Sequence, residues 1–221
     1  MWCGVRARRA VADIPSAMGA SMFKPPPAYP GMSVGLLGGT FDPPHAGHMH
    51  ISEMALKRLG LDRLWWLVTP GNPLKTRGDM TSFMERLSAA KAIARHPRID
   101  VTGFEAGTGS AYTADTIAFV KNRYASTRFV WIMGADNLES FHHWKNWQTI
   151  MEEMPVAVID RPGYRLGAHS SKAAHFFSRS YVEESDALGL KWLQPPAWTF
   201  LTVPLSAHSS TALRGANLKT G

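Results

Sequence analysis

The sequence predicts an α/β domain of the Rossmann-like class, built on a doubly wound and mainly parallel sheet. Two observations predict it. The expected strands are apolar throughout rather than alternating, which is typical of strands buried on both faces of a parallel sheet. Helical patterns stand between these strands, as repeated β-α-β units require. Sheets of this kind bind ligands beyond the carboxyl ends of their strands, so functional residues are expected at that edge.

Six short apolar or β-rich runs are expected to form the strands. They are residues 34–37, 64–68, 99–102, 129–133, 156–159 and 200–203. Between them, helical patterns cover residues 51–59 and 116–124. A further helix is expected to begin at Ser82, because Ser82 and Glu85 have the spacing of a capping box, in which each side chain accepts the backbone N–H of the other residue.

Residues 1–30 differ in composition from the rest of the chain. They are expected to form a disordered or dispensable extension to a single domain at residues 31–221, because prolines gather near residue 30 and no apolar period persists. Two alternatives remain open. The basic and nearly acid-free composition has some transit-peptide character, and translation can instead begin at a later methionine, namely Met18, Met22 or Met32.

The composition excludes several classes of protein and of site. No apolar run approaches the roughly 18 residues needed to cross a bilayer, so no membrane span is expected. The single cysteine, Cys3, excludes an intramolecular disulfide and a cysteine-rich zinc site, and it fits a reducing compartment such as the cytoplasm. The formal net charge of +7 suits polyanionic ligands, which include nucleotides, nucleic acids and lipid head groups.

The segment from Gly38 to His48 has the features of a phosphate-binding site. The first expected strand ends in Gly38 and Gly39, which allow a ligand to approach the backbone closely. A helix is expected to begin near His48, where unpaired N–H groups and the positive end of the helix dipole form an anion site. His45 and His48 are three residues apart, so both rings can point toward that anion. The segment matches neither the G-x-G-x-x-G dinucleotide loop nor the G-x-x-x-x-G-K-[ST] phosphate loop.

Residues 39–48 read Gly-Thr-Phe-Asp-Pro-Pro-His-Ala-Gly-His and resemble the signature of the nucleotidyltransferase α/β-phosphodiesterase superfamily. With Gly38, their G-G-T-F-D-P form resembles the bacterial nicotinate-nucleotide adenylyltransferases. Further segments resemble motifs of that family in the expected order, and these are residues 70–75, 112–116, 134–144, 161–163 and 208–214. Two positions depart from the family pattern, since Ala111 replaces a frequent serine and His208 replaces the usual isoleucine.

The resemblance implies a transferase of NAD biosynthesis that joins ATP and nicotinate mononucleotide to give deamido-NAD and pyrophosphate. The mononucleotide phosphate would attack the α-phosphorus of ATP in line with the departing pyrophosphate, without a covalent enzyme intermediate. Mg²⁺ is implied by the ATP chemistry, with phosphate and water as its main ligands and no dedicated metal site in the protein. The implied partners are these small molecules, not nucleic acid or a membrane. The preference for the acid over the amide is implied by the resemblance alone, and no oligomeric state is predicted.

The resemblance assigns the catalytic role to His45, His48 and Arg214, and ATP binding to a larger set that includes these three. The other members of the ATP-binding set are Gly38, Gly39, Thr40, Phe41, Gly134, Asp136, Ser209, Ser210 and Thr211. The last three are expected to supply hydroxyl and amide donors, and Arg214 a fork of charged donors. For the two serines, simple capping of the last helix is the alternative.

Mononucleotide binding is assigned to residues of several loops at the same edge. The set consists of Thr40, Asn72, Lys75, Tyr112, Thr113, Asp136, Trp144 and Arg161. Trp144 is expected to stack on the pyridine ring, with Tyr112 and Thr113 beside it. The alternatives are ordinary core packing for Trp144, a solvated loop position for Lys75 and helix capping for Asp136.

Other functions share some of these features and remain alternatives. An adenylyltransferase of nicotinamide mononucleotide or of pantetheine phosphate would have the same histidine motif. Cytidylyltransferases and class I aminoacyl-tRNA synthetases also carry H-x-G-H, but they close with different motifs. From another class, a pI of about 9.8 would fit a nucleic-acid-binding module, although the basic residues do not gather on one helix with aromatic residues between them.

Overall fold

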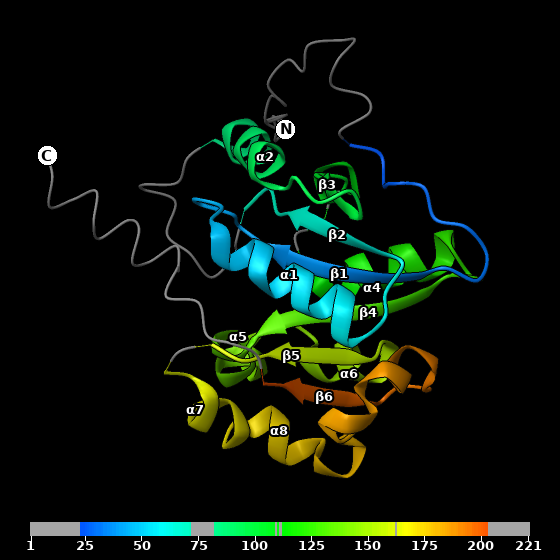
Figure 1. The fold of residues 1–221 in the computed structure, drawn as a ribbon, viewed down its shortest axis with the longest axis vertical. Helices are drawn as coiled ribbons and strands as arrows, with labels where there is room; N and C mark the ends of the chain where they lie inside the picture. Colours follow the sequence, from blue (N-terminus) through cyan, green and yellow to red (C-terminus); the bar gives the residue numbers. More distant parts are fainter. Residues whose placement is uncertain (1–22, 72–81, 109, 111, 162, 203–221) are drawn as a thin grey trace, which may run out of the picture.

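The computed structural model describes residues 23–71, 82–108, 110, 112–161 and 163–202, and it is organised around one sheet (Figure 1). In these residues six strands pair in the order β3-β2-β1-β4-β5-β6, and every pairing is parallel. The strands are β1 Ser33–Gly39, β2 Arg63–Val68, β3 Ile99–Thr102, β4 Arg128–Gly134, β5 Val156–Ile159 and β6 Trp198–Leu201. The prediction of a doubly wound, mainly parallel α/β sheet is confirmed.

Helices connect successive strands. The α-helices are α1 Ala46–Arg58, α2 Phe83–Ile93, α3 Glu105–Thr108, α4 Thr113–Arg123, α5 Ala135–Ser140, α6 Trp147–Glu153, α7 Arg165–His169 and α8 Lys172–Phe176. The 3-10 helices are η2 Phe141–His143, η3 Ser178–Ser180 and η4 Glu184–Trp192. The chain winds outward from β1 through β2 to β3, then returns past β1 to β4 and continues to β6. The winding therefore reverses between β1 and β4, the place where open α/β sheets bind their ligands.

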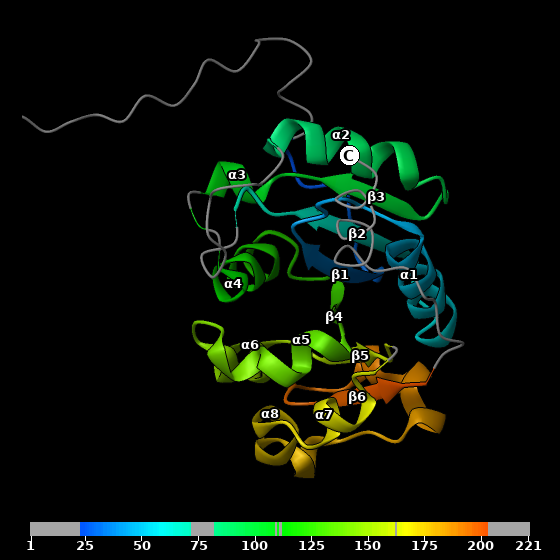
Figure 2. The same ribbon diagram turned by 90° about the vertical axis from the view of Figure 1, so that its left-hand side faces the viewer.

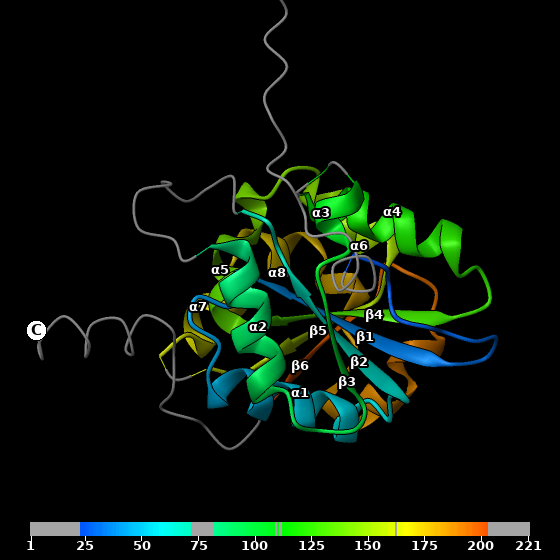
Figure 3. The same ribbon diagram turned by 90° about the horizontal axis from the view of Figure 1, so that it is seen from above.

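Two apolar layers cover the two faces of the sheet, because neighbouring residues of each strand point to opposite sides. On β2, Trp65 packs with α4, α5 and α6, whereas Trp66 packs on the other face with α1 and α2. Figure 2 shows α4 and α6 on one side of the sheet and α1 on the other, and Figure 3 shows the same separation from above. Both faces are thus closed, which explains why the strands read as continuous apolar runs.

The predicted elements agree with the structure to within a few residues. The capping box at Ser82 is present, since the Ser82 hydroxyl accepts the Glu85 N–H at 3.3 Å and the Glu85 carboxylate accepts the Ser82 N–H at 3.0 Å. The last strand lies two residues earlier than the predicted range 200–203. It begins at Trp198, because Trp198 and the buried Thr199 already pair with β5.

Part of the predicted amino-terminal extension, residues 23–30, contacts the domain. The carbonyl of Lys24 accepts a hydrogen bond from Thr102, and the carbonyl of Pro26 accepts one from the Tyr124 hydroxyl, at 3.2 and 3.0 Å. Ala28 packs against the core layer on the α4 side. The domain boundary at residue 30 stays a prediction. These contacts attach the last residues of the predicted extension to β3 and α4.

None of the helices in the described ranges has both the length and the apolar character needed to span a bilayer.

Candidate active site

The candidate active site lies at the carboxyl ends of β1, β4 and β5. A loop of residues 40–45 leads from β1 into α1, and β4 leads directly into α5. β5 ends beside β4, and residues 160–161 follow it. Because all strands are parallel, these segments meet at one edge of the sheet, where the strand arrows point in Figure 1.

Gly38 and Phe41 have structural roles, and they pack against opposite faces of the sheet. Gly38 is part of β1, and a Cβ there would lie only 2.8 Å from the Trp131 ring, so the packing of β1 on β4 requires glycine. Phe41 follows the strand with a φ of 49°, and its buried ring stacks on Trp66 with the centroids 4.9 Å apart. The Phe41 ring therefore belongs to the core, and its predicted role in ATP binding would fall to its backbone.

Gly39 and Thr40 join the loop after β1 to the loop after β2. The carbonyl of Gly39 accepts the N–H of Thr69 at 3.0 Å. The carbonyls of Thr40 and Thr69 both accept hydrogen bonds from the buried Arg86 guanidinium. Arg86 is not among the site residues predicted from the sequence. The sequence does carry one indication of Arg86. It is a charged residue directly after the capping box, at a position of the helix where the pattern predicts a residue that faces the core.

His45 and His48 form a capping box at the start of α1. His45 is the N-cap residue, and its Nδ1 accepts the N–H of Gly47 at 3.1 Å. The Nδ1 of His48 accepts the N–H of His45 at 3.2 Å, and the two ring centroids lie 3.9 Å apart. A ring nitrogen that accepts a hydrogen bond carries no proton, so each neutral ring carries its proton on Nε2. The pair therefore offers two Nε2–H donors beside a helix start, an arrangement that suits a phosphate.

The surroundings of His48 keep its ring neutral. The ring packs against Phe41 and Trp66, with centroids 4.7 and 5.9 Å apart. Burial lowers the pKa of His48 well below the usual value, and the neighbouring His45 ring and the Arg161 cation lower it further. His48 is therefore uncharged near neutral pH and acts as a hydrogen-bond donor rather than as a cation.

An ion pair between Asp136 and Arg161 joins the ends of β4 and β5. Nη1 of Arg161 donates to Oδ2 of Asp136 at 2.7 Å, and both side chains are mostly buried. Gly134 lies against this pair, since a Cβ there would be 2.3 Å from the Asp136 carboxylate and 3.1 Å from Arg161 Cδ. Asp136 does not cap α5, whose N-cap residue is Gly134. Arg161 also acts on the pKa of His48, which places the ion pair near the start of α1.

Tyr112, Thr113 and Trp144 lie on the two segments expected to hold the mononucleotide. Tyr112 is the N-cap residue of α4 and Thr113 is its first residue. Trp144 follows η2, is partly buried and meets Phe141 edge to face, with ring centroids 5.2 Å apart. The Nζ of Lys145 lies 4.1 Å from the centre of the Tyr112 ring, a cation–π contact. The structure therefore brings Tyr112 and the Trp144–Lys145 segment together.

Several predicted site residues lie outside the described residues. They are Asn72, Lys75, Ser209, Ser210, Thr211 and Arg214. Their assignments and the alternatives given for them stay predictions, as do the effects of the departures at Ala111 and His208.

Comparison with known proteins identifies the family. A model of the cytidylyltransferase-like family matches residues 36–216. The chain is 56% identical over 183 residues to a probable nicotinate-nucleotide adenylyltransferase of Methylorubrum extorquens (strain PA1), covering 83% of this chain and 99% of that protein. A probable nicotinate-nucleotide adenylyltransferase of Agrobacterium fabrum is 54% identical over 184 residues, covering 83% and 98% of the two chains. The chain belongs to the nicotinate-nucleotide adenylyltransferase family.

The fold agrees with solved structures of that family. The nicotinic acid mononucleotide adenylyltransferase of Plasmodium falciparum, complexed with NaAD, has a TM-score of 0.63 and covers 83% of each chain. The same protein complexed with APC has a TM-score of 0.60. Both are 17% identical to this chain, so this likeness concerns the fold.

Glu105 supports the segment that begins α4 and was not singled out from the sequence. It opens α3 and is buried, and its Oε1 accepts the Thr116 hydroxyl at 2.6 Å. Its Oε2 is also buried and has no hydrogen-bond partner in the part of the chain that the structure describes. Burial raises the pKa of Glu105 to about 7, against the lowering effect of the Thr116 bond. Thr116 belongs to the family motif at 112–116. A threonine hydroxyl there could have indicated that a buried polar side chain, here Glu105, lies next to it.

Glu105 is expected to make the fold less stable as the pH rises. Its pKa is about 7 in the folded protein against 4.5 for an ordinary glutamate, so the folded state holds the extra proton between these values. The stabilisation is present below pH 4.5 and is lost as the pH rises through about 7. Since one pKa unit is worth about 1.4 kcal/mol, the rise from 4.5 to about 7 means that the free energy of unfolding should fall by roughly 3 kcal/mol through this group.

Urea unfolding at about pH 5 and about pH 8 measures this loss. Glu105→Gln keeps the shape of the side chain and cannot ionise, so its free energy of unfolding should depend less on pH. Other titrating groups, His48 included, are common to both proteins and cancel in the comparison. Parallel pH profiles for the wild type and Glu105→Gln would contradict the prediction.

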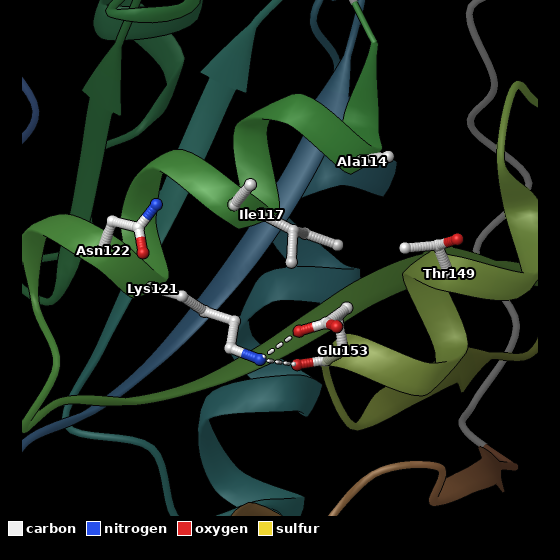
Figure 4. A pocket seen from close by; sticks show the side chains of 7 residues that line it. Ala114, Ile117, Lys121, Asn122, Thr149 and Glu153 are labelled. Atoms are coloured by element: carbon white, nitrogen blue, oxygen red, sulfur yellow. Dashed lines mark hydrogen bonds and ion pairs between the residues drawn. The ribbon is translucent and has the colours of Figure 1, made fainter.

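A groove between α4 and α6 lies apart from the residues described above (Figure 4). It has a volume of about 250 Å³ and is lined by Ala114, Ile117, Ala118, Lys121, Asn122, Thr149 and Glu153. Lys121 and Glu153 form an ion pair across it at 2.5 Å. None of the predicted phosphate-binding residues in the described ranges lines this groove, so we do not assign it to the substrates.

Proposed function

We propose that the chain transfers the adenylyl group of ATP to nicotinate mononucleotide, giving deamido-NAD and pyrophosphate. The observation that carries the proposal is the pair of neutral histidine donors at the start of α1, next to the point where the winding of the sheet reverses. The relatives that match nearly their whole length are named for the same activity.

The reaction is a direct in-line displacement. A phosphate oxygen of the mononucleotide forms a bond to the α-phosphorus of ATP as the bond from that phosphorus to the departing pyrophosphate breaks. The attacking phosphate is already ionised near neutral pH, so it needs no general base. The protein has to align two anions, screen their repulsion and stabilise the charge that grows on the pyrophosphate.

His45 and His48 would stabilise the growing charge at the ATP phosphates. Each accepts a backbone N–H at its Nδ1, so its proton is on Nε2, which would donate to a phosphate oxygen. The donors are held before the reaction by the capping box, so they cost little reorganisation as charge develops. Arg214, with the hydroxyls and amides of residues 209–211, would complete the phosphate site from the end of the chain.

The mononucleotide would occupy the edge between α4 and η2. Trp144 would stack on its pyridine ring, with Tyr112 and Thr113 at the amino-terminal end of α4 beside it. Asp136 and Arg161 form an ion pair close enough to His48 for Arg161 to lower its pKa, and they would contact ribose and phosphate groups. Asn72 and Lys75 would contact the mononucleotide from the loop after β2.

Magnesium would accompany ATP. In the described residues no group of three or more His, Cys, Asp and Glu side chains is placed to hold a metal ion. Mg²⁺ usually keeps several water ligands and binds substrate phosphates rather than an all-protein cage. When bound, the ion would neutralise part of the phosphate charge.

Incubation with ATP and Mg²⁺ plus one acceptor at a time, assayed for pyrophosphate, tests the function. The acceptors are nicotinate mononucleotide, nicotinamide mononucleotide and pantetheine phosphate. We expect kcat/KM to be highest for nicotinate mononucleotide by at least about tenfold, a difference of roughly 1.4 kcal/mol in transition-state binding. Equal values for the acid and the amide would refute the substrate assignment and leave the reaction class intact. Pyrophosphate release with none of the three would refute the reaction class.

A further inference from the structure

The Arg86 side chain is buried behind the loops that follow β1 and β2. It projects from the first turn of α2, whose start is set by the Ser82 capping box, and only 2% of the residue is exposed. Removing a guanidinium from water is costly unless its donors are satisfied inside the protein. Its position therefore calls for specific partners.

Three backbone carbonyls of the two loops are among those partners. One terminal nitrogen, Nη1, donates to the carbonyls of Thr40 and Thr69 at 2.5 and 2.9 Å, and Nη2 donates to the carbonyl of Pro70 at 3.3 Å. Thr40 belongs to the family signature, whereas Thr69 and Pro70 follow β2. One side chain therefore connects the ends of two adjacent strands at the edge where the substrates are expected.

Asp42 contributes an opposite charge from within the signature segment. Its carboxylate is buried and lies close enough to raise the pKa of Arg86, although burial lowers that pKa by more. An arginine keeps its charge in spite of such a shift. A carboxylate of the signature segment thus acts electrostatically on the α2 cation inside the protein.

We propose that Arg86 is a positioning residue for adenylyl transfer, holding the loops after β1 and β2 in the relative placement that aligns the two phosphate-bearing substrates. The inference rests on the proposed function. Arg86 acts through the backbone of Thr40, Thr69 and Pro70 and needs no contact with either substrate. A lysine cannot replace it, because a flexible ammonium does not direct donors at several carbonyls in a fixed fork.

Arg86→Lys tests the role of the fork while keeping the charge. We expect kcat to fall by roughly 10- to 100-fold, because a shift of about 1 Å between reacting groups can cost 10²-fold. The KM values for both substrates should change by less than about threefold, since the groups that bind them are still present. The assay is run well below the Tm, where nearly all molecules are folded, so a residue that only stabilises the fold would leave kcat unchanged as well.

Leu87→Ala is the matched control. Leu87 is the next residue of α2 and is fully buried in the core, so its truncation weakens the same helix without removing a bond to the loop carbonyls. Assayed well below its Tm, it should keep kcat within about twofold of the wild type. If Arg86→Lys does not fold, Arg86→Gln, which buries no charge, replaces it with the same expectations.

Wild-type kcat in the Arg86 variant would overturn the proposal. So would an equal fall in kcat in Leu87→Ala at a comparable loss of Tm, because helix stability alone would then explain the effect. Failure of the proposed function looks different, since the wild-type protein itself would release no pyrophosphate with nicotinate mononucleotide.

Discussion

His48→Ala is expected to lower kcat for pyrophosphate release by about 10²-fold or more, the scale seen when one preorganised charge-stabilising donor is lost. The His48 ring is neutral, because burial lowers its pKa and the neighbouring His45 and Arg161 lower it further. Its orientation is set by the N–H of His45, which donates to its Nδ1 at 3.2 Å. Removing the ring therefore removes a fixed Nε2–H donor at the expected phosphate site. Steady-state kinetics with ATP and nicotinate mononucleotide measures the effect.

Three further variants separate the lost donor from the lost cap. His48→Gln can place an amide N–H near the former Nε2 and should recover part of kcat. Ser82→Ala removes a comparable cap from α2 and should cost about 1 kcal/mol of stability without a similar loss of kcat. His50→Ala changes the same residue type two positions along α1, on a different side of the helix, and should leave kcat nearly unchanged. Nearly normal pyrophosphate release by folded His48→Ala would make His48 a structural residue only.

Trp144→Ala is expected to raise the KM for the mononucleotide roughly ten- to a hundredfold and to leave the KM for ATP nearly unchanged. Loss of one aromatic stacking contact on a base-like ring is worth about 1–3 kcal/mol, and each 1.4 kcal/mol is about tenfold in affinity. The edge-to-face contact with Phe141 orients the Trp144 ring, and the next residue, Lys145, contacts Tyr112 at the start of α4. Trp144→Phe should recover much of the loss, because a smaller flat ring can still stack.

Trp147 provides the control for ordinary packing. It is buried in the same core layer and lies on α6, three residues beyond Trp144. Truncation of Trp147 should lower the Tm while the two KM values change together. If Trp144→Ala behaves in the same way, or keeps the wild-type KM for the mononucleotide while folded, Trp144 does not bind the ring. Tm and both KM values are measured on the same samples.

Most of the fold could be predicted from local patterns. A parallel strand covered on both faces needs apolar residues at consecutive positions, so β1, β2, β4 and β5 stand out in the sequence as uninterrupted runs. The strand β6 was placed two residues late, because Thr199 and the preceding Pro195–Pro196 weaken the apolar run at its start. The capping box at Ser82 was found because both of its partners lie within four residues of one another.

The partners of the site residues could not be predicted in the same way. The spacing of His45 and His48 predicts that they lie together, but the proton on Nε2 and the lowered pKa follow from Gly47, Phe41 and Arg161 around them. The alternative of helix capping for Asp136 was open until its ion pair with Arg161 was seen. These contacts join residues from different strands and helices.

The amino-acid sequence by itself determined the class of sheet, the edge that carries the site and the family, because each is encoded in contiguous runs and motifs. Only the tertiary structure decided which groups face one another there: Arg86 with the carbonyls of two loops, and Glu105 with Thr116. The physical reason is that burial, pKa and hydrogen-bond satisfaction depend on what lies alongside a group in space, and folding brings those neighbours from distant parts of the chain.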